Sequence, residues 1–516
     1  MTHKSFLTIC CLWFIAIGLL GCATNPVTGR SELNIISESW ELKTGKQHYL
    51  PMRQSQGGDY VADPKVQDYV RQVGNKLAAV SDRKLPYEFS VVNDSSANAW
   101  ALPGGKIAIH RGLLTELKSE AELAAVLSHE IVHAAAKHGA KSMQRGMLLQ
   151  STIALAGAAA ENSSYTEYAE RAAELGATLI STKYGRDAER ESDLYGMNYM
   201  TRAGYDPMGA VDLQQTFVNI SRSRQSNALA PLFASHPPSK ERLASNRAHA
   251  ATLPKGGARG TARYQQVMQH LRTTKPAYQA YAKATAAFAE ADFTTAQALA
   301  KTAIKIEPNE AHFFGLLGDI ASINDRVALA QRHYRHAIRL NDRFFYPHLQ
   351  SGLISKELGE LDAAKASLKR SIALLPTASA HNALGEIAES EGNLAQAKEY
   401  FAAASEDNGE AGQAAQTALI RLNVAENAGA YITTTVELAG TGEWVITLHN
   451  TAPRDFTDLT LVLAYADQNG RVRRQQLNLR GHISAQNRRR IYSGLTVKAS
   501  LYPPQVSVSE IQLRTN

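Results

Sequence analysis

The spacing of apolar residues changes along this 516-residue chain, and each change predicts a different kind of structure. A nearly unbroken apolar run extends from Phe6 to Leu20. From about residue 59 to 252, apolar residues recur mostly at the spacing of amphipathic helices. Helical spacing continues from about 275 to 425, and from about 430 to 516 apolar and polar residues alternate as in strands. The pattern predicts a multidomain protein with two helical regions followed by an all-β region.

The first helical region contains two stretches that are typical of strands. Phe89–Val92 is a short apolar run, and Lys106–His110 alternates polar and apolar residues. We expect a mainly α domain with a small sheet, in which the Lys106–His110 strand could hold an extended peptide by edge pairing. Leu253–Gly260 is rich in proline and glycine and is a plausible linker to the next region.

The second helical region repeats itself. Ala303-Ile304, Ala337-Ile338 and Ser371-Ile372 recur at 34-residue intervals, which is the period of tetratricopeptide repeats. Small residues such as Gly318 and Gly352 stand where paired helices must approach closely. The repeated spacing argues against the alternative of an irregular helical bundle. We predict an α-solenoid of about four repeats, whose concave face would bind segments of other proteins.

The last region is predicted to be a small β-sandwich of six or seven short strands. Asn469-Gly470 is a strong hairpin signal between two of these strands. The basic run Arg488–Arg490 is better interpreted as a solvated strand end than as a contact for anionic lipid. The clearest strand candidates are Thr433–Leu438, Glu443–His449, Leu459–Tyr465 and Val472–Leu479.

The start of the chain has the pattern of a secretory signal. Lys4 precedes the apolar run, and small residues close it, which favours a cleaved signal over an uncleaved N-terminal anchor. Leu19-Leu20-Gly21-Cys22 resembles a bacterial lipobox, which implies cleavage before Cys22 and attachment of lipid to its thiol. Because Ala23 follows instead of an aspartate, we expect the mature protein at the periplasmic face of the outer membrane.

Cysteine use and charge narrow the alternatives further. The chain has three cysteines, Cys10, Cys11 and Cys22, so the mature protein could form no internal disulfide. Its stability must therefore come from packed cores. The formal net charge of +7 is mild for this length and is not concentrated enough to indicate nucleic-acid binding.

The chemistry is carried by the motif His129-Glu130-Ile131-Val132-His133. On a helix, positions i and i+4 share one face, so the two imidazoles could bind one Zn²⁺ and Glu130 could act as a general base. The surrounding segment Ser119–His138 is rich in Ala, Leu and Val, with Ser119 and Glu122 as a capping box and Gly139 as the expected C-terminal stop. The alternative is a core helix with two satisfied histidines.

A catalytic zinc needs a third protein ligand, and the best candidates lie in Tyr184–Asp193. Glu189 and Asp193 stand at i and i+4 on an expected helix. One carboxylate could bind the metal while the other orients a ligating imidazole. Spacing alone does not separate Glu189 from Glu191, and any of these acids could instead be an exposed helix charge.

These motifs resemble the HtpX/CAAX-prenyl-protease class of zinc peptidases. H-E-I-V-H is followed by Tyr184-x-Arg186-x-x-Glu189-x-Glu191-x-Asp193, and Asn98–Gly105 precedes it. The resemblance covers roughly residues 25 to 425 and implies a zincin-like metallopeptidase fold with one Zn²⁺ per subunit. It implies that His129, His133 and Glu189 bind the metal and that Glu130 is the base. It also places His236, in the loop Ser235-His236-Pro237, at the metal.

The resemblance and the pattern together predict five segments. These are a lipoprotein signal peptide at 1–21, a lipidated N-terminus and lead-in at 22–58, a zinc metallopeptidase domain at 59–252, tetratricopeptide repeats at 275–425 and a β-sandwich at 430–516. We expect a zinc-dependent metalloendopeptidase of the bacterial envelope that cleaves misassembled outer-membrane or periplasmic proteins. The lipid would hold it on the membrane, outer-membrane assembly machinery is an expected partner, and nucleic acid is not.

Two functional questions stay open at the level of sequence. Arg186 or His236 could stabilise the oxyanion of the reaction. Alternatively, His236 could fill the fourth zinc position and keep the enzyme latent. The rival function is a chaperone-like scaffold for outer-membrane protein assembly, with proteolysis secondary.

Overall fold

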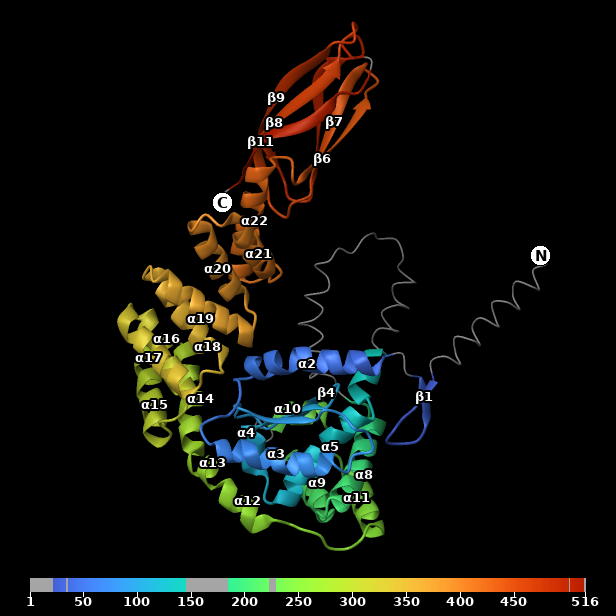
Figure 1. Ribbon diagram of the computed structural model, residues 1–516, viewed down its shortest axis with the longest axis vertical. Coiled ribbons are helices and arrows are strands. Elements are labelled where there is room, and N and C mark those ends of the chain that lie inside the picture. The colour runs from blue at the N-terminus through green and yellow to red at the C-terminus, as the bar shows by residue number, and fades with distance from the viewer. Residues whose placement is uncertain (1–21, 34–35, 145–183, 222–228, 501, 515–516) are drawn as a thin grey trace, which may run out of the picture. The chain divides into compact units, whose positions relative to one another are not determined.

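The computed structural model describes residues 22–33, 36–144, 184–221, 229–500 and 502–514. The expected signal peptide therefore lies outside the described residues. The chain divides into two compact units, one ending at Pro376 and the other beginning at Thr377. Figure 1 shows the order of their elements along the chain. None of the described helices is long and apolar enough to span a lipid bilayer.

A three-stranded sheet forms the base of the first helical region, with the order β3 (Glu88–Val92), β5 (Lys106–His110) and β4 (Ala99–Leu102). β3 runs parallel to β5, and β4 runs antiparallel to it. The expectation that Lys106–His110 is an edge strand is wrong, because β4 folds back on it through Gly104 and Gly105, whose φ angles are +76° and +82°. β3 and β4 are thus the outer strands of this sheet; Asp59 bridges β3 at Val92, and no described strand pairs with the outer edge of β4.

Alternate residues of the sheet face different cores. Ile107 and Ile109 of β5 join the main core with helices α3 (Pro64–Ala78) and α5 (Glu120–Ala135). Ala108 faces the other way, toward a smaller core with α2 (Glu38–Ser55). Figure 1 shows α2 on one side of the sheet and α3 and α5 on the other. Every residue of β5 is buried because both of its faces are covered.

Helix α5 lies at the centre of the first helical region. Its first turn is capped as predicted, since the Ser119 hydroxyl accepts the backbone N–H of Glu122 at 3.2 Å. The Glu122 carboxylate accepts the backbone N–H of Lys118 at 2.8 Å. The helix ends at Ala135, before the predicted stop at Gly139, because Lys137 takes a left-handed conformation with φ 61°.

Other helices pack around α5 or follow it in the chain. Contacts with α5 are made by α3, α8 and α9, while α11 packs on α8 and α9. The short helix α10 places the loop that follows it beside the same core. The bounds are α4 Arg111–Glu116, α8 Arg186–Arg202, α9 Met208–Ser221, α10 Ala230–Ser235, α11 Lys240–Thr252, α12 Thr261–Val267 and α13 Gln269–Thr273.

The predicted repeats are confirmed as successive antiparallel helix pairs. In three of the pairs a glycine permits close approach: a Cβ added to Gly318 would clash with the ring of Tyr334. Gly352 meets Leu368 in the same way, and Gly385 meets Phe401. The first unit holds α14 Lys275–Ala289, α15 Phe293–Ile306, α16 Ala311–Ile323, α17 Val327–Leu340, α18 Phe345–Glu357 and α19 Leu361–Leu374; the second begins with α20 Ala378–Ser390, α21 Leu394–Ala404 and α22 Glu410–Glu426.

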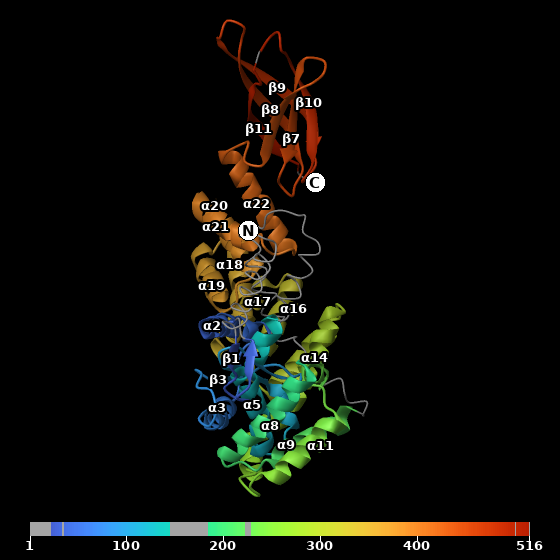
Figure 2. The same cartoon turned by 90° about the vertical axis from the view of Figure 1, so that its right-hand side faces the viewer.

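The predicted β-sandwich is confirmed as two antiparallel three-stranded sheets, ordered β10-β7-β6 and β11-β8-β9 (Figure 2). Their inner faces meet in one core, to which Ile420 of α22 also belongs. Arg488–Arg490 opens β10 with largely exposed side chains, as the preferred interpretation held. The strands are β6 Ile432–Leu438, β7 Glu443–Asn450, β8 Phe456–Ala466, β9 Val472–Ile483, β10 Arg488–Thr496 and β11 Gln505–Leu513. At the other end of the described chain, β1 Cys22–Thr24 pairs with β2 Ser31–Leu33.

Candidate metal centre

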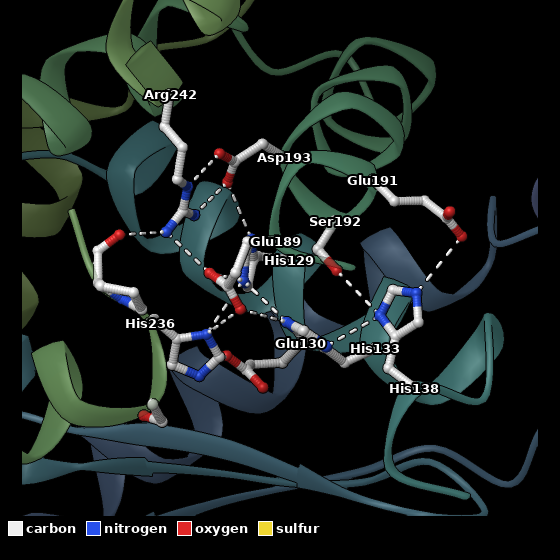
Figure 3. A network of polar contacts seen from close by, with 12 residues as sticks. His129, Glu130, His133, His138, Glu189, Glu191, Ser192, Asp193, His236 and Arg242 are labelled. Atoms are coloured by element: carbon white, nitrogen blue, oxygen red, sulfur yellow. Dashed lines mark hydrogen bonds and ion pairs between the residues drawn. The ribbon is translucent and has the colours of Figure 1, made fainter. Parts of the chain in front are cut away.

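Helix α5 presents its three chemical residues toward one point. His129 and His133 lie one turn apart, with their Nε2 atoms 3.0 Å from each other. Glu130 points to the same region and is 2 % exposed. Figure 3 shows these side chains converging with groups from α8 and from the loop after α10.

Helix α8 supplies the carboxylates. Glu189 Oε1 lies 3.4 Å from His133 Nε2, and Glu189 Oε2 lies 3.6 Å from His129 Nε2. Glu191 points away and contacts His138 Nε2 at 3.3 Å (Figure 3). The structure therefore brings Glu189, and not Glu191, to the two histidines.

The loop after α10 places a third imidazole against this group. His236 Nδ1 is 3.0 Å from Glu189 Oε1 and 3.3 Å from His129 Nε2. Its other nitrogen, Nε2, is 3.6 Å from Glu130 Oε1. His236 is 7 % exposed, so its ring is largely shielded from solvent in this conformation.

The spacing of these atoms fits a tetrahedral metal ion. Two ligands about 2.0–2.1 Å from a tetrahedral zinc are about 3.4 Å apart. One ligand atom each from His129, His133, Glu189 and His236 lies within 4.8 Å of all the others. The Nε2 atoms of His129 and His133, 3.0 Å apart, repel as lone pairs unless a proton or a cation lies between them. The donor set of three imidazoles and one carboxylate is the kind that zinc prefers.

The two buried glutamates have different environments. Burial raises the pKa of Glu130, and its Oε2 atom has no hydrogen-bond partner among the described residues. Burial also opposes ionisation of Glu189, but the neighbouring His236 and His129 hold its pKa well below the usual range. One carboxyl is thus suited to exchange a proton and the other to remain an anionic ligand.

Asp193 and Arg242 orient this group from behind. Asp193 Oδ1 lies 3.0 Å from His129 Nδ1, so that when His129 donates this bond its Nε2 is left as the ligand atom. Arg242 donates to both oxygens of Asp193, at 2.8 and 2.7 Å, and its Nη1 is 2.8 Å from Glu189 Oε2. Burial opposes ionisation of Asp193, but Arg242 and His129 lower its pKa below the usual value.

The expected role of Arg186 finds no support in the structure. Arg186 is the first residue of α8, is exposed, and makes no contact with this group among the described residues. The cation beside Glu189 is instead Arg242, from α11. The sequence did not indicate it, because only the packing of α11 on α8 brings it there.

Two further residues support His133 and were also missed. The ring of Tyr184 stacks on that of His133, with centroids 3.9 Å apart. His138 Nδ1 lies 3.0 Å from His133 Nδ1. His138 follows the end of α5, so its helical spacing could not place it beside the motif. Tyr184 was visible only as the first residue of the run that contains Glu189.

Comparison with known proteins agrees with this geometry. Residues 64–250 match peptidase family M48, and residues 378–406 match the tetratricopeptide repeat. The first match contains the HExxH helix, α8 and His236.

Individual relatives match the same part of the chain. A putative beta-barrel assembly-enhancing protease of Vibrio cholerae is 28% identical over 268 residues, covering 48% of this chain and 52% of that protein. The mitochondrial metalloendopeptidase OMA1 of Schizosaccharomyces pombe is 30% identical over 221 residues, covering 42% and 63%. The beta-barrel assembly-enhancing protease of Escherichia coli is 28% identical over 235 residues, covering 43% and 46%. The chain thus spans about half the length of these relatives.

Proposed function

Residues 64–250 form a peptidase domain of family M48, and from that premise we propose that the protein is a zinc-dependent metalloendopeptidase. The observation that carries the proposal is the group of four ligand atoms from His129, His133, Glu189 and His236, with Glu130 beside it. Zinc, when bound there, would lower the pKa of water toward 7 and polarise the scissile carbonyl.

The residues of the chain perform the proton transfers. Glu130, with its raised pKa and unpartnered Oε2, takes a proton from the attacking water and returns it to the leaving amine. Asp193 fixes the ring of His129, and Arg242 fixes Asp193. The unpaired edge of β4, which packs beside α5, is the place where an extended substrate can align.

The test of the proposal is Glu130→Gln. This variant should lose hydrolysis of an unfolded protein substrate by at least about 100-fold, because no other group takes the proton. Its zinc content, measured by atomic absorption, should equal that of the wild type. Glu116→Gln, on α4 and away from the site, is the matched control and should retain full activity. Substantial hydrolysis by purified Glu130→Gln would remove Glu130 from its role.

In this conformation His236 blocks access to the site and so keeps the enzyme latent. Its Nδ1 lies among the ligand atoms and its Nε2 faces Glu130, so it stands where water or substrate must enter. The loop that carries it must move before a peptide can reach the metal. His236→Ala should therefore raise the rate of hydrolysis, measured with the same substrate. Unchanged or lower activity with full zinc content would contradict this latch.

The cellular setting follows from the segments outside the site. The leader and Cys22 support a lipid-anchored enzyme at the periplasmic face of the outer membrane. The names of the bacterial relatives support misassembled outer-membrane or periplasmic proteins as substrates, recruited by the repeats. Replacement of Cys22 by Ser should release the protein from membranes, as measured by fractionation. Retention of Cys22→Ser in the membrane fraction would contradict lipid anchoring.

The repeats also favour a second candidate function, a scaffold for outer-membrane protein assembly, with outer-membrane assembly machinery as partner. A scaffold would not need the proton transfer of Glu130. Complementation of a deletion strain by Glu130→Gln separates the two, because the scaffold function survives this change and the proteolytic function does not.

A further inference from the structure

A small cavity adjoins the metal centre. Its volume is about 50 Å³, which is room for a few non-hydrogen atoms beyond a single water. His129, Glu130 and His236 form one wall, so any group that enters the cavity lies next to the bond that the enzyme attacks. The remaining lining comes from α5, α8, α9, α10 and α11, and its apolar side chains include Val126, Met200, Leu213, Phe217 and Leu232.

Polar side chains also line the cavity, and Gln214 differs from the others in carrying a buried donor without a partner among the described residues. Gln214, on α9, is 5 % exposed and lines the cavity. Its Nε2 atom is buried and has no hydrogen-bond partner among the described residues. Buried amide donors are nearly always paired, because an unpaired donor loses its hydrogen bonds to water without replacement. An unpaired donor in a cavity beside a reaction centre indicates that a ligand supplies the acceptor.

The cavity also restricts what that ligand can be. A volume of about 50 Å³ excludes long or aromatic side chains. Glu130 and Asp193 line the same space. The cation of the lining, Arg242, is already paired with Asp193 and Glu189. The carboxyl of Glu130, whose Oε2 atom has no partner among the described residues, therefore disfavours an acidic side chain. A short neutral side chain with an oxygen acceptor fits the cavity, adds no negative charge and accepts the hydrogen bond of Gln214.

We propose that Gln214 is a specificity-determining residue, which selects substrates with Thr or Asn next to the scissile bond. The Nε2 group of Gln214 donates to the side-chain oxygen of that residue. Val has nearly the shape of Thr, and Leu that of Asn, but neither has an oxygen acceptor. Both therefore leave the Nε2 group of Gln214 unpaired. This inference rests on the proposed peptidase function and names a substrate feature for the same site.

The experiment uses the zinc-loaded full chain and peptides that differ only in Thr versus Val, or Asn versus Leu, beside the cleaved bond. The wild type should cleave the Thr and Asn peptides with a kcat/KM roughly tenfold higher than their partners. Gln214→Met keeps the length of the side chain but has no N–H group. It should bring both ratios close to one, mainly by slowing cleavage of the Thr and Asn peptides.

A neighbouring glutamine provides the control. Gln215 bonds to Asn219 at 2.8 Å and to Arg247 at 2.8 Å, outside the cavity, so Gln215→Met should keep the wild-type ratios. Gln214→Leu repeats the test if the Met variant does not fold. Cleavage by Gln214→Met with unchanged ratios would overturn the role of Gln214 alone. If the wild type shows no cleavage that depends on Glu130, the peptidase function is overturned, and the inference with it.

Discussion

At the scale of single residues, Asp193 shows how a side chain that does not touch the metal controls it. It lies 3.0 Å from His129 Nδ1 and is held by two bonds from Arg242. Asp193→Asn should weaken zinc binding about 10- to 100-fold, because the amide no longer fixes the tautomer of His129. Titration against a competing chelator measures this change. Asp187→Asn, with a 97% exposed side chain on the same helix, should bind zinc like the wild type; an equal loss in both variants would contradict the argument.

The sequence predicted the residues that local geometry brings together. His129, Glu130 and His133 share a helix, and a period of 3.6 residues fixes their relation. Glu189 required the resemblance to a family, since spacing alone left Glu191 as an equal candidate. Arg242 and Gln214 could not be predicted, because each reaches the site only through the packing of a separate helix against α5 or α8.

At the scale of helices and strands, the glycines of the repeats set how closely two helices pack. Gly318→Ala should lower the free energy of unfolding by about 1–3 kcal/mol, because its Cβ would clash with the Tyr334 ring. Gly315 lies on the same helix, where an added Cβ meets nothing within 4 Å. Gly315→Ala should be neutral or stabilise by up to about 1 kcal/mol. Urea unfolding of both variants checks the prediction, which fails if the two changes have equal effects.

Glu310 joins the repeats to the peptidase region within the first unit. It caps the N-terminus of α16, where its carboxylate accepts the backbone N–H of His312 at 3.1 Å. The Asn93 amide donates to both carboxylate oxygens at 3.0 Å, and the Tyr278 hydroxyl donates at 2.9 Å. Burial opposes its ionisation, but His312 and Arg111 lower the pKa of Glu310 from 4.5 to about 2. A lowered folded-state pKa gives stability that is present above pH 4.5 and is lost as the pH falls toward 2.

Glu310→Gln should therefore cost on the order of 2 kcal/mol of unfolding free energy at neutral pH. The difference from the wild type should shrink as the pH is lowered below 4.5, because protonation removes the same charge. Chemical unfolding at a series of pH values measures both curves. Parallel curves for the two proteins across this range would exclude Glu310 as the source of the pH dependence.

Alternation of apolar and polar residues reveals some of the strands and not others. In the β-sandwich one face of each strand meets the core, so alternation located four of the six strands of that domain to within a few residues. Ala99–Leu102 was not recognised, because all four of its residues are buried and no alternation is left in the sequence. Because that strand was missed, Lys106–His110 was expected at the edge of the sheet, whereas it pairs with a strand on each side.

At the scale of the whole molecule, the metal should stabilise one unit and not the other. Among the described residues the metal-binding group lies in the unit that ends at Pro376. Removal of zinc with a chelator should lower the melting temperature of that unit by roughly 5 °C, because a native-state ligand is lost. The transition of the unit that begins at Thr377 should not move. Scanning calorimetry before and after zinc is restored tests this; equal shifts in both transitions would contradict it.

The wide separation of the ligands along the chain also sets when hydrolysis can begin. His129, Glu189 and His236 belong to three segments that meet only after α5, α8 and the loop after α10 have packed. Contacts between distant segments form late in folding. We therefore expect that a chain that has not finished folding cannot cleave itself or neighbouring proteins. In refolding with cobalt, the visible absorption of the ligated ion should accordingly grow only in the slowest phase.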